Sequence, residues 1–374
     1  MKPSFTRVAR LTTVVVAASL PVWGFIPSSG ASSSAKNVNI VGYSVVGPAF
    51  KSLETAFEAT PTGAGVTFTN SFGASDTQTQ NVAHGQQADL VNLSYQPNLS
   101  SLVTAGKVPA TWASQELTYG HVNTALTGKK TQTTFSTPGI VTDSLVVFVV
   151  RKGNPLKVAN WSDLVKKGVQ IVTPNPLTSG SARWNLVAAY SSQRQLGHSG
   201  TASRAYLKLF LSHTVAQPTS GSASMSAFLG GTGNILVDYE DDAKAALAAG
   251  DAIQIVTPPQ TFLIENPVAL TNTGLTNPSA VAFYRYLFSA AGQGIFASLG
   301  FRSVLKTIWT ATESNFPRRT LTNALWNVNN INPQGWKFVN PFFFWPTVVF
   351  AKGSTTSPTR GLATYDEEFA GTAT

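Results

Sequence analysis

The sequence predicts an α/β fold that is large enough to form two lobes. From residue 38 onward, short apolar runs alternate with segments whose apolar residues recur at helical spacing. This alternation is typical of strands packed against helices. The chain has 374 residues, of which 43% are hydrophobic and 11% are charged. It can therefore bury a large core, and its composition is not that of a disordered protein.

In the first half of the chain, a buried strand is expected at residues 38–41. A helix is expected from about 48 to 59, because Phe50, Leu53 and Phe57 share one helical face and Pro48 suits a first helical turn. The dense β-branched run at 144–150 is typical of a central strand. We expect further strands at 66–69, 88–93 and 169–172, and helices at 75–86, 161–166 and 181–194.

The same alternation continues in the second half. Strands are expected at 235–237, 253–256 and 268–270, and helices at 205–211, 240–249 and 279–288. Residues 321–350 are rich in aromatic side chains, including Trp326, Trp336 and Trp345. We expect this segment to pack against the surface of a lobe rather than to stack on a ligand.

The first 35 residues have the pattern of an export signal. Lys2, Arg7 and Arg10 precede an apolar stretch at 11–26, and small residues follow it. The stretch is short and interrupted by Pro21, so a cleaved signal is favoured, with an uncleaved anchor as the alternative. Cysteine is absent, which excludes disulfides, thiolate metal sites and a lipid-bearing cysteine. Residues 353–374 are polar and predict a loose tail.

The charge pattern argues against a nucleic-acid partner. The formal net charge is +9, but lysine and arginine are scattered and form no basic stripe. Diffuse positive charge suits a protein that handles anions. The histidines have no metal-ligand spacing, and the acidic run at 238–242 is expected to complement the dipole of a helix start. We therefore expect no metal and no other cofactor; the histidines are His84, His121, His198 and His213.

Small polar residues stand repeatedly just before an expected helix. A helix N-terminus leaves backbone N–H groups unpaired and carries partial positive charge, so it can bind an anion without a charged side chain. Small residues let a ligand approach the backbone closely. One such turn is usually only an N-cap, but several in one α/β chain suggest an anion site. The segments are 42–44, 73–76, 178–183 and 220–224.

Several motifs occur in the order of a known family. The most distinctive one, at 172–185, reads Val-Thr-Pro-Asn-Pro-Leu-Thr-Ser-Gly-Ser-Ala-Arg-Trp-Asn. Less specific stretches lie at 149–155, 160–164, 265–269 and 335–339. Together they resemble the periplasmic sulfate- and thiosulfate-binding proteins of ABC importers, and the resemblance covers residues 38–352.

The resemblance implies a two-lobed periplasmic binding protein of type II, with a mixed sheet in each lobe and a hinge between them. The first lobe would comprise residues 36–142 and 264–352, and the second residues 143–263. A protein of this family is not an enzyme. It would bind sulfate or thiosulfate outside the cytoplasmic membrane as a monomer and deliver the anion to a membrane permease.

The resemblance also implies a set of neutral hydrogen-bond donors from both lobes. Three positions depart from the family pattern. Tyr239 replaces an indole, and both Ser181 and Asp76 stand where the family usually has glycine. Around Ser222 the chain is about one residue shorter than the family. The implied ligand-binding residues are Ser44, Ser75, Ser179, Gly180, Ser181, Ser222 and Tyr239.

Asp76 decides between sulfate and phosphate as the ligand. Sulfate only accepts hydrogen bonds, so a pocket of donors satisfies it. Phosphate keeps a proton near neutral pH and needs an acceptor, which Asp76 would supply if it faced the ligand. The alternative is that Asp76 caps its helix and points away. Arg183 is expected to order the loop beside Ser179, or to pair with Asp238 or Glu240.

A secreted hydrolase is a further alternative, with Ser179 as its nucleophile. The sequence has no nucleophile-elbow motif around this serine, and no histidine stands in a motif that would make it the base. Sulfate binding by neutral donors is therefore the favoured function. Because neither sulfate nor neutral donors titrate between about pH 5 and 8, the sequence alone predicts an affinity that is nearly constant over this range.

Overall fold

The structure is a computed structural model, and it describes residues 36–115, 139–317 and 325–344. Within these ranges one ten-stranded sheet has the order β2-β1-β3-β9-β4-β7-β5-β6, and β8 and β10 pair with β4 outside this path. The predicted signal at 1–35 and the predicted tail at 353–374 lie outside the described residues, as do His121 and Trp345.

The first part of the sheet is parallel, and each strand is followed by a helix. β1 (Asn37–Tyr43) pairs with β2 (Thr67–Gly73) and with β3 (Leu90–Asn92). In such an arrangement the helix N-termini meet at the carboxyl edge of the sheet. The helical segments that follow are η1 (Ser44–Val46), α1 (Gly47–Glu58), α2 (Ser75–Ala83) and α3 (Gln96–Thr104), with η2 (Trp112–Ser114) after them.

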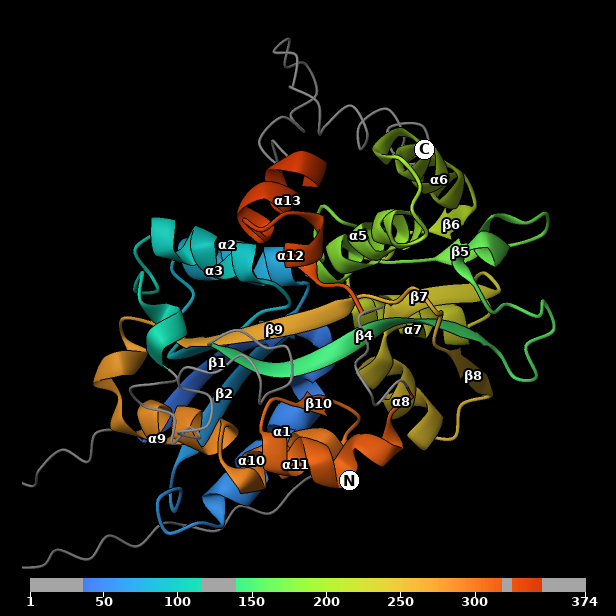
Figure 1. Ribbon diagram of the computed structural model, residues 1–374. Helices are drawn as coiled ribbons and strands as arrows, with labels where there is room; N and C mark the ends of the chain where they lie inside the picture. The colour runs from blue at the N-terminus through green and yellow to red at the C-terminus, as the bar shows by residue number, and fades with distance from the viewer. Residues whose placement is uncertain (1–35, 116–138, 318–324, 345–374) are drawn as a thin grey trace, which may run out of the picture. The chain divides into compact units, whose positions relative to one another are not determined.

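Two long strands, β4 (Ile140–Arg151) and β9 (Leu263–Leu270), run across the middle of the sheet (Figure 1). β9 pairs antiparallel with β3 on one side and with β4 on the other, as far as Leu145 of β4. From Val146 onward, β4 pairs with β7 (Ile235–Tyr239), and its last residues also pair with β8 (Ile253–Val256). The two mixed parts of the sheet are thus joined through β9 and β4.

The second part of the sheet again places helices after parallel strands. β7 pairs in parallel with β5 (Ile171–Val172), and β5 pairs in parallel with β6 (Thr214–Ala216). Helix α5 has buried residues from Gly180 to Gln193, so it lies inside the molecule. The helical segments of this part are η3 (Trp161–Val165), α5 (Gly180–Gln195), α6 (Gly200–Ser212), α7 (Gly221–Leu229) and α8 (Glu240–Ala248).

The segment after β9 returns to the first part of the sheet. Its strand β10 (Arg302–Ser303) pairs antiparallel with β4. The Trp336 ring lies with its centroid 5.1 Å from that of Tyr95 and 4.7 Å from that of Trp184, which is the packing expected for the aromatic segment. The helical segments are η4 (Gly274–Thr276), α9 (Pro278–Leu287), α10 (Ala290–Ser298), α11 (Lys306–Thr312), η5 (Glu313–Asn315), α12 (Val328–Ile331) and α13 (Trp336–Phe344).

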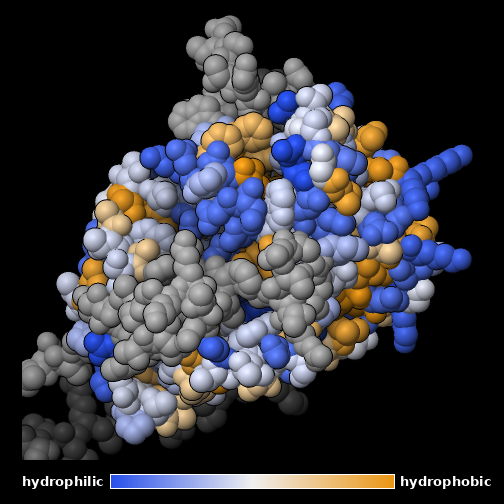
Figure 2. Space-filling model, in the orientation of Figure 1, coloured by the Kyte–Doolittle hydropathy of each residue, from blue (hydrophilic) through white to orange (hydrophobic). Residues whose placement is uncertain are grey.

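Most expected elements are present, but several have different bounds. The strand expected at 268–270 begins at Leu263 and is buried along its whole length. Its first half was not expected, because Glu265, Asn266 and Pro267 interrupt the apolar pattern in the sequence. The helix expected at 161–166 is a short 3-10 turn. On the face shown in Figure 2, apolar residues (orange) are interspersed with hydrophilic ones (blue).

A buried ion pair joins α8 to β10. The Arg302 Nε donates to Glu240 Oε2 at 2.6 Å and its Nη2 donates to Oε1 at 3.1 Å. The side chains are only 2% and 1% exposed. Two charges buried this deeply need each other, since either one alone would lose its hydration without compensation.

Replacing Arg302 by Met should lower the free energy of unfolding by about 3–5 kcal/mol, because the Glu240 carboxylate would remain buried without a partner. The double variant Arg302→Met with Glu240→Gln should be clearly more stable than the single one. Urea unfolding measures both, with Lys208→Met on the exposed face of α6 as the control. Equal losses in the single and double variants would contradict this account.

Candidate functional site

The residues implied as ligands all lie where a strand ends and a helical segment begins. Ser44 opens η1 after β1, and Ser75 is the first residue of α2 after β2. Ser179 is the N-cap of α5, with Gly180 and Ser181 in its first turn. Ser222 is the second residue of α7, and Tyr239 is the N-cap of α8.

The helix starts in this region are of two kinds. The N-cap side chain makes no capping bond at α1, α2, α5 or α8, as is also true of α3 and α11. Helix α7 is capped by Ser220. A first turn without a side-chain cap can keep N–H groups available to a ligand. At α2 and α8 part of this capacity is used, because the Asp76 N–H donates to the Thr178 carbonyl and the Asp241 N–H donates to the Ser144 Oγ at 3.5 Å.

Four of the predicted serines lie close together around the starts of α5 and α7. The hydroxyls of Ser179 and Ser181 are 3.1 Å apart. A Cβ atom placed on Gly221 would lie 3.3 Å from the Ser181 Oγ, so the two helix starts are neighbours. The backbone N–H of Ser222 donates to the Ser44 Oγ at 3.3 Å. Ser44 follows β1, so this bond joins the two parts of the sheet.

Ser75 reaches the same region through Ser94, which the sequence analysis did not identify. The N–H and the hydroxyl of Ser94 donate to the Ser75 Oγ at 3.0 Å and 2.5 Å. A Cβ atom on Gly180 would lie 2.3 Å from the Ser94 Oγ, so only glycine fits at this close approach. Ser94 follows β3 and precedes α3, the same strand, small residue and helix pattern that marked the other segments.

We name Ser44, Ser75, Ser94, Ser179, Gly180, Ser181 and Ser222 the serine cluster. Its members are buried or partly buried; Ser75, Ser179 and Ser181 are 2%, 2% and 3% exposed. All of them offer N–H or O–H donors, and none carries a formal charge. The cluster therefore suits a ligand that accepts hydrogen bonds on several sides.

Tyr239 lies beside the serine cluster with its hydroxyl inside the protein. The residue is fully buried, and its hydroxyl has no hydrogen-bond partner of normal geometry among the described residues. Burial raises its pKa well above the usual value, Asp241 and Asp238 raise it further, and the nearby polar groups of Asn266 and Ser181 lower it. The hydroxyl thus lies near Ser181, where it could donate a hydrogen bond to a ligand.

Asp76 and Arg183 form an ion pair with each other, which corrects the expected cap by Asp76 and the expected acidic partner of Arg183, whereas the bond from Arg183 to the Pro176 carbonyl agrees with its expected role in ordering the loop beside Ser179. Asp76 does not cap α2 with its side chain; its Oδ2 accepts from the Arg183 Nη2 at 2.5 Å, and its Oδ1 accepts from the Asn98 Nδ2 at 2.6 Å. Arg183 does not pair with Asp238 or Glu240, and Glu240 is bound to Arg302 instead.

Further contacts of the Arg183 guanidinium hold it beside Asp76. Its Nη1 donates to the Asn340 Oδ1 at 3.1 Å, and its Nε donates to the Pro176 carbonyl at 3.1 Å. The guanidinium also lies 5.3 Å from the centroid of the Tyr95 ring. The backbone N–H of Asp76 donates to the Thr178 carbonyl at 3.0 Å. The starts of α2 and α5 are therefore tied together by both backbone and charged side chains.

The acidic run at the start of α8 is more deeply buried than a surface helix start would be. Burial, with the neighbouring Asp242 and Asp241, raises the pKa of Asp238 well above its usual value. Burial is also the largest cause that raises the pKa of Asp241 to about 8 and that of Asp242 to about 6. No group of histidine and acidic residues in the described ranges has the arrangement of a metal site.

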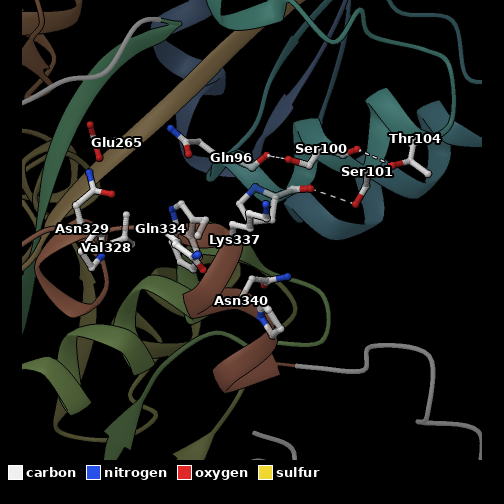
Figure 3. A pocket seen from close by; sticks show the side chains of 15 residues that line it. Gln96, Ser100, Ser101, Thr104, Glu265, Val328, Asn329, Gln334, Lys337 and Asn340 are labelled. Atoms are coloured by element: carbon white, nitrogen blue, oxygen red, sulfur yellow. Dashed lines mark hydrogen bonds between the residues drawn. The ribbon is translucent and has the colours of Figure 1, made fainter.

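Two grooves lie near the serine cluster, and one pocket lies apart from it. A groove of about 630 Å³ contains Ser44, Ser222, Asp241 and Asp242 among its lining residues. A smaller one of about 240 Å³ is lined by the Asp76 and Arg183 pair. The pocket in Figure 3, about 600 Å³, lies between α3 and the segments α12 and α13 and contains no member of the serine cluster.

The chain resembles known solute-binding proteins over most of its length. Residues 38–302 match the model of the family described as bacterial extracellular solute-binding protein. The sulfate-binding protein of Synechococcus elongatus is 30% identical over 350 residues, covering 91% of this chain and 93% of that one. The thiosulfate-binding protein of Pseudomonas aeruginosa is 28% identical over 300 residues, covering 77% and 85%.

A solved structure agrees with these matches. The sulfate-binding protein SubI from Mycobacterium tuberculosis aligns with a TM-score of 0.73 and 35% identity, covering 82% of this chain and 99% of that one. None of the helices in the described ranges is long and apolar enough to span a membrane. The chain belongs to the family of bacterial extracellular solute-binding proteins, among the sequences similar to sulfate- and thiosulfate-binding proteins.

Proposed function

We propose that this protein is the extracytoplasmic binding component of an ABC importer and that it captures sulfate or thiosulfate. Its relatives include sulfate- and thiosulfate-binding proteins, which supports this class of ligand. The observation that carries the proposal is the serine cluster, in which neutral donors converge from helix starts on both parts of the sheet. The protein would act as a monomer that binds its anion without chemical change and hands it to a membrane permease.

Neutral donors suit a fully ionised oxyanion for an electrostatic reason. Each oxygen of sulfate accepts hydrogen bonds, and the partial charges of the helix starts spread the counter-charge over many peptide groups. The Ser179 and Ser181 hydroxyls, the Gly180 N–H and the Tyr239 hydroxyl would contact the anion from one side. Ser44 and Ser75 would contact it from the other, together with Ser94.

The two parts of the sheet would act as the two lobes, with residues 36–142 and 264–352 in the first and 143–263 in the second. β4 and β9 are the strands that pass between them, so they would form the hinge. The Ser44–Ser222 bond and the Asp76–Arg183 pair connect these lobes at the serine cluster. We therefore take the structure to represent the closed form.

The Asp76–Arg183 pair favours sulfate over phosphate. Both carboxylate oxygens of Asp76 already accept from Arg183 and Asn98. A carboxylate engaged in this way has little capacity left to accept the proton of a bound phosphate, so phosphate would lose a hydrogen bond in the site. Residues 1–35 would serve as the cleaved signal that exports the chain.

Replacing Ser179 by Ala should weaken sulfate binding about 5- to 150-fold, because one charge-assisted hydrogen bond of about 1–3 kcal/mol is lost. Isothermal titration calorimetry of the purified protein with sulfate measures this. Ser100→Ala, on the exposed side of α3, is the matched control and should bind as the parent does. An unchanged dissociation constant for Ser179→Ala would remove this serine from the site.

Replacing Asp76 by Asn should leave the preference for sulfate over phosphate intact, because Asp76 acts on Arg183 rather than on the ligand. The same change should lower the free energy of unfolding by about 3 kcal/mol, since the buried guanidinium loses its counter-charge. Competition titrations with both anions and urea unfolding measure the two effects. If phosphate outcompetes sulfate in the parent protein, and Asp76→Asn reverses this order, Asp76 is the proton acceptor after all.

A further inference from the structure

Three buried carboxyl groups stand where β7 ends and α8 begins, and no salt bridge reaches them in the described ranges. Asp238 is fully buried and Asp241 is 1% exposed. The three salt bridges of the described residues involve other acids. In each of Asp238, Asp241 and Asp242, the Oδ2 atom has no hydrogen-bond partner. A buried carboxylate normally has a counter-charge or a full set of donors, so these groups call for another explanation.

The strand residues that contact these acids carry no positive charge, although Lys244 of α8 lines the same groove as Asp241 and Asp242. From β4, Ser144 donates its hydroxyl to Asp241, and a further acid, Asp143, lies on the same strand. From β1, Tyr43 faces Asp241, which helps to raise the tyrosine pKa after the larger effect of burial. Helix α7 and strand β8 carry no charged residues.

The nearby basic groups are engaged elsewhere. Arg302 of β10 binds Glu240 and also donates to the Pro317 carbonyl. Lys244 of α8 donates its ammonium group to the Asn315 carbonyl at 2.7 Å. Arg151, at the far end of β4, donates to the Gly233 carbonyl and lies over the Phe228 ring. The charge of the three aspartates is therefore not balanced by a bonded cation.

These carboxyl groups adjoin the serine cluster. Asp241 and Asp242 line the same 630 Å³ groove as Ser44 and Ser222. A Cβ atom on Gly221 would lie 3.9 Å from the Asp238 Oδ1 and 3.3 Å from the Ser181 Oγ. An oxyanion held by the serine cluster would thus lie close to all three. Ionised carboxylates at such short range in a buried site would repel a dianion strongly.

We propose that Asp241 must be protonated for the anion to bind, so that in alkaline solution sulfate and a proton enter the site together. This inference rests on the proposed function. Burial, the largest cause, raises the pKa of Asp241 to about 8, and the neighbouring Asp242 adds to the effect. Burial also raises the pKa of Asp238 well above its usual value, whereas the pKa of Asp242 rises only to about 6. The protonated acids are neutral, and their O–H groups are donors like the rest of the site.

The sign of the pH dependence follows from this assignment. Below the pKa of about 8, Asp241 already holds its proton, so this residue does not make the affinity change with pH; Asp242, with a pKa of about 6, loses its proton at lower pH. Above the pKa of Asp241, its carboxylate must take up a proton from solvent before the anion can bind, and each further pH unit should weaken binding up to tenfold. This differs from a site built only of neutral donors, whose affinity is constant with pH.

The test is calorimetric titration of the full protein with sulfate between about pH 7 and about pH 9, above the pKa of about 6 of Asp242. We expect the dissociation constant to rise about tenfold over this range for a group with a pKa of about 8. Titrations in two buffers of different ionisation enthalpy count the protons taken up. About half a proton per sulfate is expected at pH 8 and nearly one at pH 9, since sulfate itself does not titrate there.

The variant Asp241→Asn keeps the shape of the side chain but has no proton to gain or lose. It should bind sulfate with an affinity that no longer depends on pH and without proton uptake. Asp251→Asn, a partly exposed acid beyond α8, is the control and should retain the parent's pH dependence. Circular dichroism checks that both variants fold.

The outcomes separate this inference from the proposed function. Constant sulfate affinity with no proton uptake in the parent protein would overturn the inference while leaving the function standing. An unchanged pH dependence in Asp241→Asn would overturn the assignment to this residue. If the parent binds no sulfate at any pH, the proposed function itself fails. Should Asp241→Asn fail to fold, the proton count of the parent still decides.

Discussion

The structure depends on helix N-termini whose backbone N–H groups are left without side-chain caps at one place. At α2, α5 and α8 the residue before the helix provides no capping bond. Such ends are unfavourable in a folded protein unless a ligand or water completes them. Glycine and serine occupy these helix starts because larger side chains would push the helix starts apart. Gly180 shows this most directly, since a methyl group would collide with Ser94.

The sequence was sufficient to predict the helix starts but not their long-range partners. Ser75, Gly180 and Ser222 stand in local patterns of strand, small residue and helix, and these patterns are visible without a structure. Ser94 was missed because, although a strand was expected at 88–93, no helix was expected after it; α3 (Gln96–Thr104) has a weak apolar periodicity. The Asp76–Arg183 pair joins residues more than one hundred positions apart, and local sequence carries no signal for such a contact.

The acidic run at the start of α8 is buried, which its sequence pattern does not indicate. In sequence, Glu240, Asp241 and Asp242 look like a surface helix start whose charges complement the dipole. In the fold, Glu240 and Asp241 are almost inaccessible to solvent, because β4 and β7 lie against this helix start. Glu240 finds Arg302, whereas Asp241 finds only a serine and a tyrosine. Neighbouring acidic residues thus have different partners, an arginine in one case and uncharged hydroxyl groups in the other.

The acidic residues around the serine cluster are all subject to one electrostatic constraint. A buried site for a dianion has to remove every uncompensated negative charge nearby, either by an ion pair or by protonation. Arg183 neutralises Asp76 at the start of α2, and Arg302 neutralises Glu240 at the start of α8. Asp241 has no arginine available, so a proton is what remains to neutralise it. A chain that pairs Asp76 and Glu240 with arginines and leaves Asp241 to a proton would have an affinity that is sensitive to pH through Asp241.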